Sequence, residues 1–228
     1  MYNYAMEKNG FTLIEISIIL VIIGLIIGGI FSGKSLIENA KNQKAIDQLN
    51  RYTIAINSFN DTYAAFPGDM VNAEAYWTSA VTSNGNGDSI INNPIVEGIL
   101  AWQHLSLSGK IAESYSGLGS QYVTGVSIPE NAYGRRWYVN NATLTSFGQV
   151  RASGNHIKMA NGDNNVHWCA GVPIASTIYI DKKIDDGKAV TGRVIGWNPC
   201  GGESACVSSD QYILTNEGFG CQLHFFYF

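Results

Sequence analysis

A run of apolar residues close to the N-terminus constrains the fold more than any other feature. Residues 11 to 31 have the sequence FTLIEISIILVIIGLIIGGIF, in which Glu15 is the single ionisable residue and Thr12 and Ser17 are the other polar side chains. As an α-helix with a rise of about 1.5 Å per residue, this run covers roughly 30 Å, the thickness of the hydrocarbon core of a bilayer. The sequence therefore predicts a membrane-spanning helix over residues 11–31.

Two other kinds of apolar segment fit the run less well. The apolar part of a cleaved secretory signal and a buried core helix usually contain about 7 to 15 residues. Signal peptidase also needs small residues at A-x-A spacing after the apolar part, and residues 32–35 match this pattern poorly. The length and the flanking sequence both favour a span that stays in the protein.

Glu15 is an unusual residue inside such a span. A carboxylate at membrane depth costs about 2.5 to 3.5 kcal/mol on insertion scales, so we expect Glu15 to have a partner. Cleavage of the chain after Gly10 would give Phe11 a positively charged α-amino group. Glu15 of one subunit could then neutralise Phe11 of its neighbour in a helical assembly, which would set the register between subunits.

The residues from Gly10 to Glu15, with the sequence GFTLIE and an apolar helix after them, carry a family resemblance. They resemble the cleavage and methylation signal of type IV pilins and of the pseudopilins of type II secretion systems. The resemblance covers about the first thirty residues and implies that residues 1–10 are a leader peptide. It also implies that prepilin peptidase cleaves after Gly10 and methylates Phe11, and that Glu15 guides the docking of subunits.

The same resemblance implies a location and a set of partners. The expected location is the bacterial inner membrane, crossed once, with residues 67–228 as a head in the periplasm. The expected partners are like subunits or other pilins, prepilin peptidase and an inner-membrane assembly platform. The positive charges of Lys34, Lys41, Lys44 and Arg51 follow the span and by themselves favour the opposite orientation. We give the family motif more weight than this count.

An amphipathic pattern follows the apolar run, over residues 32–66. Ala45, Leu49, Tyr52, Ile56, Phe59 and Tyr63 recur at spacings of three and four, which is the period of one helix face. Pro67 and Gly68 must end this helix, because the residue before a proline is disfavoured in the α region. The pattern predicts one long helix over roughly residues 11–64, with this stripe packed on the core of the head.

Short elements are predicted in the head. Pro94 and Gly109 bound a helix with an apolar stripe at Ile99, Trp102 and Leu105. Residues 174–184 could form a second short helix, with a strand as the alternative. Strands are expected near residues 136–139, 156–159, 190–197 and 222–228. The predicted fold class is α+β, with a long N-terminal helix on a small antiparallel sheet and extended loops. The resemblance implies a pilin-like α/β roll.

Charge and motifs bear on the class of function. The chain has 14 Lys and Arg against 18 Asp and Glu, a net charge of −4, which disfavours nucleic acid as the main partner. The four histidines lack HExxH spacing, and neither a GxSxG elbow nor a phosphate-binding loop occurs. We therefore predict a protein that is not an enzyme and has no catalytic residues.

Four cysteines near the C-terminal end predict two disulfides on the exported side, with three pairings open. They are Cys169, Cys200, Cys206 and Cys221. We favour Cys200 with Cys206, because the glycines between them let the chain fold back, and Cys169 with Cys221, which would tie down the last strand. Zinc is the alternative, but the paired CxxC or CxxH clusters of zinc sites do not occur here.

Two oxygen-rich segments are candidate calcium sites. Asn84, Asn86 and Asp88 alternate with glycines as in half of a calcium loop, but a bidentate Glu twelve positions from its start is missing. Asp181, Asp185 and Asp186 form a second acidic corner. The alternatives are a polar turn and the solvated end of a helix. Some secretion pseudopilins bind calcium in the head, so the resemblance keeps calcium open, and we expect no other cofactor.

These observations lead to one hypothesis with one rival. The hypothesis is a structural subunit of a type IV pilus or of a type II secretion pseudopilus, whose work is assembly into a helical filament. The motif does not separate these two uses. The rival is a signal-anchored periplasmic enzyme or ligand-binding protein, in which residues 1–10 would stay attached.

Overall fold

A computed structural model describes residues 11–92, 96–117, 122–146, 149–162, 169–198, 206–214 and 219–227. The chain divides into two compact units, with the boundary between Ala40 and Lys41. Gly10 lies outside the described residues.

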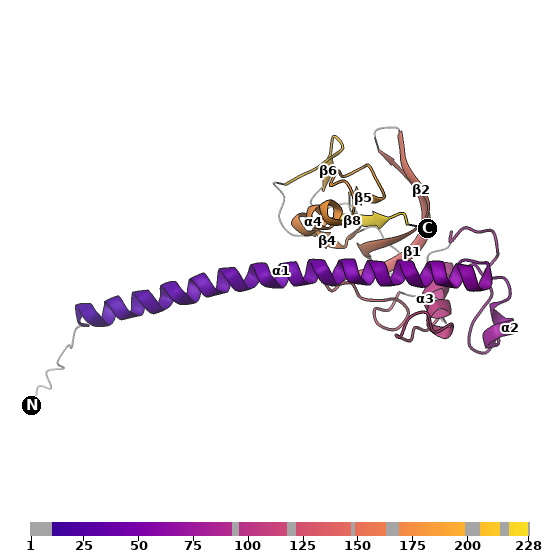
Figure 1. The fold of residues 1–228 in the computed structure, drawn as a ribbon, viewed down its shortest axis with the longest axis horizontal. Helices are drawn as coiled ribbons and strands as arrows, with labels where there is room; N and C mark the ends of the chain where they lie inside the picture. The colour runs from indigo at the N-terminus through magenta and orange to yellow at the C-terminus, as the bar shows by residue number, and fades with distance from the viewer. Residues whose placement is uncertain are drawn as a thin grey trace, which may run out of the picture. The chain divides into compact units, whose positions relative to one another are not determined.

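The first unit consists of the N-terminal part of helix α1, which runs over Leu13–Tyr63 (Figure 1). The helix continues through Gly24, Gly28 and Gly29 without interruption. Its most apolar stretch has a mean hydropathy of 2.8, and none of that stretch is buried inside the protein. The chain therefore has one described helix that is long and apolar enough to cross a membrane, and the predicted long apolar helix is confirmed.

The second unit contains the folded core, and α1 enters it at Lys41. The predicted stripe is buried from Ala45 to Phe59, and Tyr63 packs against its end. Tyr52 lies at the centre, since its ring contacts Trp102 at 4.8 Å and Trp137 at 5.7 Å between ring centroids. The helix ends at Tyr63, shortly before Pro67, as predicted.

The other helices of the second unit are short. They are α2 (Ala73–Trp77), α3 (Glu97–Leu107) and α4 (Ile174–Ile184). The helix expected before Gly109 is thus confirmed, and residues 174–184, for which a helix and a strand were both open, form a helix. Gly109 follows α3 with a φ of +68°, a conformation that favours glycine after a helix.

Antiparallel pairing joins the strands, in the described part of the chain, into one sheet of six strands and one of two. The strand order of the larger sheet is β1-β2-β8-β4, with β3 beside β2 and β5 beside β8. The smaller sheet is the hairpin β6–β7. The strands are β1 (Arg136–Ser146), β2 (Gln149–Asn161), β3 (Cys169–Ala170), β4 (Val172–Pro173), β5 (Val194–Trp197), β6 (Val207–Ser208), β7 (Gln211–Tyr212) and β8 (Phe219–Phe225).

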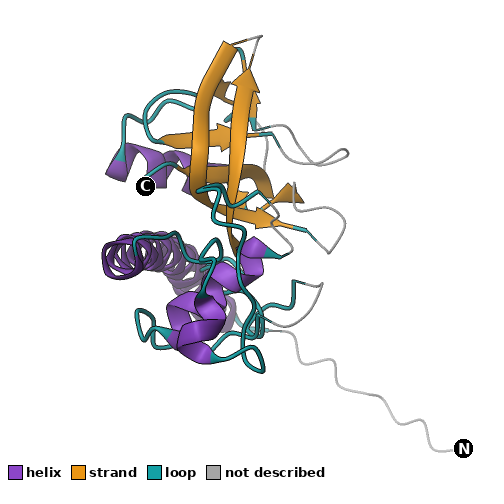
Figure 2. Cartoon of the chain, turned by 90° about the vertical axis from the view of Figure 1, so that its right-hand side faces the viewer, coloured by secondary structure: helices purple, strands orange, loops and turns teal. Residues whose placement is uncertain are grey.

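One face of the large sheet packs on α1. Ile157 and Met159 of β2 pair in register with Phe225 and Leu223 of β8, and all four belong to the core that contains the α1 stripe. Figures 1 and 2 show the sheet on one side of the α1 segment that follows Lys41, and α3 on the other side. The fold is therefore α+β, with helix α1 packed on an antiparallel sheet.

All four predicted strands have different bounds. Strands β1 and β2 are longer than the stretches expected near residues 136–139 and 156–159. The strand expected over residues 190–197 begins at Val194, because the Asp185 carboxylate accepts the N–H groups of Arg193 and Val194 and holds the preceding segment as a loop. The last strand covers Phe219–Phe225 rather than residues 222–228.

Candidate functional site

The N-terminal site predicted from the sequence begins with an exposed Phe11 and the first turn of α1. The carboxylate of Glu15 accepts hydrogen bonds from the N–H and from the hydroxyl of Thr12, both at 2.7 Å to Oε2. The N–H of Glu15 donates in return to the hydroxyl oxygen of Thr12 at 3.3 Å. This reciprocal arrangement is a capping box, which satisfies N–H groups that have no partner within the helix.

The capping box gives Thr12 and Glu15 a role within the subunit, and the role of Glu15 between subunits stays a prediction. It engages only one oxygen of the carboxylate, since Glu15 Oε1 accepts no hydrogen bond from any described residue. The helix surface beyond it is almost wholly apolar and exposed, with Leu13, Leu25 and Phe31 each more than two-thirds exposed. Such a surface needs a lipid or a protein partner.

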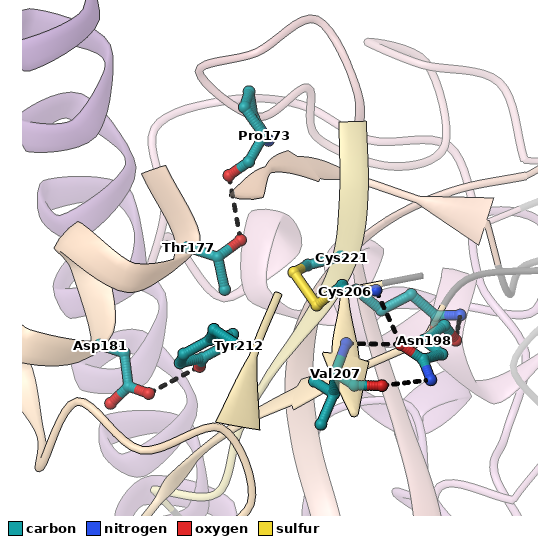
Figure 3. The surroundings of a disulfide bond; sticks show 9 residues. Pro173, Thr177, Asp181, Asn198, Cys206, Val207, Tyr212 and Cys221 are labelled. Atoms are coloured by element: carbon teal, nitrogen blue, oxygen red, sulfur yellow. Dashed lines mark hydrogen bonds between the residues drawn. A yellow bond between two sulfur atoms is a disulfide. The ribbon is translucent and has the colours of Figure 1, made fainter. Parts of the chain in front are cut away.

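The disulfides differ from the predicted pairs. Cys206 is bonded to Cys221, with 5.2 Å between their Cα atoms (Figure 3). Both predicted pairs, Cys200 with Cys206 and Cys169 with Cys221, are therefore wrong. Cys169 is also disulfide-bonded, and Cys200 lies outside the described residues.

The Cys206–Cys221 bond depends on contacts between segments that are far apart in the sequence. Trp197 of β5 pairs with Gln222 of β8, which brings the end of β5 beside Cys221. The side chain of Asn198 then accepts the N–H groups of Cys206 and Val207 at 2.8 and 2.7 Å, so that Cys206 lies next to β8. The short spacing between Cys200 and Cys206 does not reveal this arrangement.

The segment around Asn84 is a polar turn that a buried carboxylate organises. Asp69 accepts hydrogen bonds from the N–H groups of Gly87, Asp88 and Ser89 at 2.7 to 3.2 Å. The predicted calcium ligands are engaged too. Asn84 accepts the N–H of Glu74, Asn86 accepts the N–H of Asp88, and Asp88 accepts the N–H of Ile90. The contacts support the polar-turn interpretation. No motif or spacing pointed to Asp69.

The second predicted cation site does bring its three carboxylates together. Oxygen atoms of Asp181, Asp185 and Asp186 lie within 4.8 Å of one another. Each carboxylate accepts hydrogen bonds from the protein, however. Asp181 accepts the Tyr212 hydroxyl at 2.6 Å (Figure 3), and Asp186 accepts the Thr191 hydroxyl at 2.5 Å.

Burial and hydrogen bonding shift the pKa values of these acids in different directions. Burial raises the pKa of Asp181 to about 6, although hydrogen bonds from Tyr212 and Gly187 act against the shift. The hydrogen bond from Thr191 lowers the pKa of Asp186. The corner thus works as the C-terminal stop of α4. Among the His, Cys, Asp and Glu side chains of the described residues, it is the only group of three that could hold a cation.

The histidines are built into the core. His156 and His224 lie on adjacent strands with 2.9 Å between Nε2 and Nδ1, and both are buried. Burial lowers the pKa of His156 to about 3 and that of His224 well below its ordinary value. His104 is buried beside α1 with its pKa lowered to about 4, again by burial, whereas His167 lies outside the described residues.

The tryptophans of the described residues mostly fill the core. Trp102 and Trp137 are fully buried, and Trp77 packs against the core. Trp197 is half-buried, and Trp168 lies outside the described residues.

Comparisons with known proteins add no relative to this description. No protein-family model matches the chain, and searches among curated proteins and solved structures find no match.

Proposed function

We propose that the protein is a structural subunit of a type IV pilus or a type II secretion pseudopilus, made with a leader that prepilin peptidase removes after Gly10. The observation that carries the proposal is the start of α1. A Thr12–Glu15 capping box opens an exposed apolar helix, and the same helix continues into the core of an α+β unit. A pilin-like roll is the interpretation of this fold that agrees with the N-terminal motif.

The mechanism is assembly rather than catalysis. In the membrane, the apolar surface between Leu13 and Phe31 contacts lipid, and in the filament it packs against the same surface of other subunits. Glu15 keeps its own helix capped through Oε2. Its second oxygen is available for the α-amino group of Phe11 in the neighbouring subunit. This contact would neutralise a charge that is costly away from water.

The first experiment determines the intact mass and the N-terminal peptide of the protein taken from native membranes or from a surface fraction. Loss of residues 1–10 together with a methylated Phe11 supports entry into the pilin pathway. An intact leader, or cleavage beyond Ser32, contradicts the proposal and favours the rival, a signal-anchored periplasmic enzyme or ligand-binding protein.

A second experiment tests the role of Glu15 directly. Glu15→Gln keeps an oxygen that can accept the Thr12 N–H but removes the charge, whereas Glu15→Lys reverses the charge. We expect both variants to be inserted and folded, and to enter filaments poorly, with Glu15→Lys excluded. Ser17→Ala is the matched control, since Ser17 lies on the same helix and bonds only the carbonyl of Ile14. Normal incorporation of Glu15→Lys would refute this mechanism.

The use of the filament needs a test in cells. A deletion strain tested for protein secretion, adhesion and twitching motility separates a secretion pseudopilus from a surface pilus. Loss of secretion alone identifies the pseudopilus, and loss of adhesion or twitching identifies the pilus.

A further inference from the structure

A pocket outside the predicted sites lies between α4, the loop after α4 and the hairpin β6–β7. Its volume is about 460 Å³, which is in the range of roughly 300 to 1,000 Å³ typical of small-molecule sites. Ala189 and Val190 line it with buried apolar side chains, and Ile178 and the ring of Tyr212 add half-buried ones. Leu214 contributes an apolar side chain that is 76% exposed.

Several independent contacts fix the walls of this pocket. The Tyr212 hydroxyl donates to Asp181, and its ring lies so close to Gly196 that a Cβ there would meet Cε1 at 2.5 Å. The Cys206–Cys221 disulfide joins the start of the hairpin to β8 (Figure 3).

The turn of the hairpin is held from the large sheet. Arg151 of β2 forms an ion pair with Asp210 at 2.7 Å. Ser209 and Asp210, the two residues of the turn, have φ values of +49° and +66°. Positive φ at both central residues is the conformation that a two-residue hairpin turn of this kind requires. The ion pair and the turn together hold this wall of the pocket against the large sheet.

The charges around the pocket favour an anion. Lys182 and Lys188 line it. Neither lies within ion-pair distance of a described carboxylate, although the charge of Lys188 helps to lower the pKa of Asp186. The stem of Lys182 crosses Gly187, where an added Cβ would meet its Cγ at 2.5 Å. Asp210, the acidic residue of the lining, is already paired with Arg151.

The neighbouring carboxylates do not line the pocket, and each of them is engaged. Asp181 accepts the Tyr212 hydroxyl, Asp185 accepts two backbone N–H groups and Asp186 accepts the Thr191 hydroxyl. Two ammonium groups without an ion-pair partner therefore remain beside an apolar surface.

We propose that this pocket binds a small organic anion, a carboxylate carried on an apolar or aromatic body. The apolar body lies against Ile178, Val190 and Tyr212, and the carboxylate lies between the ammonium groups of Lys182 and Lys188. This inference does not depend on the filament proposal, because its residues all belong to the second unit.

The test uses the full chain in lipid nanodiscs and 2-naphthoate as the probe, followed by isothermal titration calorimetry with empty nanodiscs as the blank. We expect saturable binding of 2-naphthoate. The neutral isostere 2-naphthamide should bind about fivefold to tenfold more weakly, since two exposed charge contacts contribute about 1 kcal/mol in total. Acetate, which lacks the apolar body, should not bind measurably.

A double variant locates the site. Lys182→Gln with Lys188→Gln should weaken 2-naphthoate binding to the level of the amide, while Lys183→Gln, an exposed neighbour outside the lining, should leave it unchanged. The thermal midpoints of all variants should agree, because the three lysines are exposed. Absence of saturable binding, equal binding of acid and amide, or unchanged binding by the double variant would each overturn the proposal.

Discussion

The backbone N–H of Gly68 donates a hydrogen bond to Nδ1 of His104 at 2.9 Å, across 36 residues of sequence. Because Nδ1 accepts, the imidazole carries its proton on Nε2, which lies 3.2 Å from the hydroxyl oxygen of Thr82. Thr82 donates in turn to Gln103, and Gln103 donates to the carbonyl of Val81. The network joins the chain after α1 to α3 through four hydrogen bonds that follow one another.

This network leads to a prediction for Gly68. Its φ is +90°, and an added Cβ would lie 2.1 Å from the carbonyl oxygen of Glu97. Gly68→Ala should therefore lower the free energy of unfolding by more than about 3 kcal/mol, because the backbone must move and break the bond to His104. Urea denaturation checks this value.

Gly109→Ala is the matched control. Gly109 also has a positive φ, +68°, but a Cβ there would meet no atom within 4 Å. The free energy of unfolding of this control should fall by only about 1 kcal/mol, which is the cost of an alanine in the left-handed conformation. Equal losses in the two variants would show that close packing at Gly68 is unimportant.

The buried histidines predict a loss of stability in acid. Burial lowers the pKa values of His104, His156 and His224 below their unfolded value of about 6.5. The unfolded chain then binds more protons than the folded one as the pH falls below about 6.5. As the pH falls from about 6 to the pH at which the folded form titrates, each histidine should lower the free energy of unfolding by about 1.4 kcal/mol per pH unit.

Asp181 has the opposite effect on stability. Burial raises its pKa to about 6, so the folded chain takes up this proton before the unfolded chain does and gains stability as the pH falls below about 6. Three histidines outweigh one aspartate. Urea midpoints at pH 7.5 and pH 5.0 should thus fall with acidification, and His224→Gln should reduce the difference. A midpoint that is constant or rises toward pH 5.0 would show that the histidines are accessible to protons in the folded state.

The Cys206–Cys221 disulfide should contribute about 3 kcal/mol, the chain-entropy value for a loop of about 15 residues. The double variant Cys206→Ser with Cys221→Ser should lower the thermal midpoint by the amount that corresponds to this loss of about 3 kcal/mol. Digestion without reductant, followed by mass spectrometry, should recover a peptide that links these two cysteines. A peptide that links Cys200 to Cys206 would contradict the structure.

The capping box predicts different effects for two substitutions of Thr12. Thr12→Ser keeps the hydroxyl and should behave as the wild type, whereas Thr12→Val removes both hydroxyl contacts with Glu15. Loss of a cap costs about 1 kcal/mol. Amide hydrogen exchange at the start of α1, in micelles, should accelerate about fivefold in Thr12→Val alone. Equal exchange in both variants would contradict a capping role for the hydroxyl.

Local patterns predicted the helices well. The apolar run, the three-and-four spacing from Ala45 to Tyr63 and the break at Pro67 define α1 almost completely. Pro94 and Gly109 bound the region of α3 in the same way. These signals succeed because a helix is fixed by contacts between residues close in sequence.

Long-range contacts escaped prediction. The partner of Cys206 depends on the register of β5 against β8, and the role of Asp69 depends on a loop eighteen to twenty residues later. The ion pair of Arg151 with Asp210 joins residues 59 positions apart. Residue type and spacing do not predict which distant segments come into contact. The sequence therefore predicted candidate residues but not the residues that contact them. The roles of Phe11 and Glu15 between subunits remain predictions.

The buried stripe of α1 also has a mechanical consequence. From Ala45 to Phe59 it covers about 21 Å along the helix axis. A tension transmitted along α1 would pull this segment lengthwise across the sheet, so that its contacts would resist in shear and fail together. A hairpin peeled from its end breaks one contact at a time and yields at lower force. The attachment of α1 to its core is therefore well suited to carrying a load along the helix.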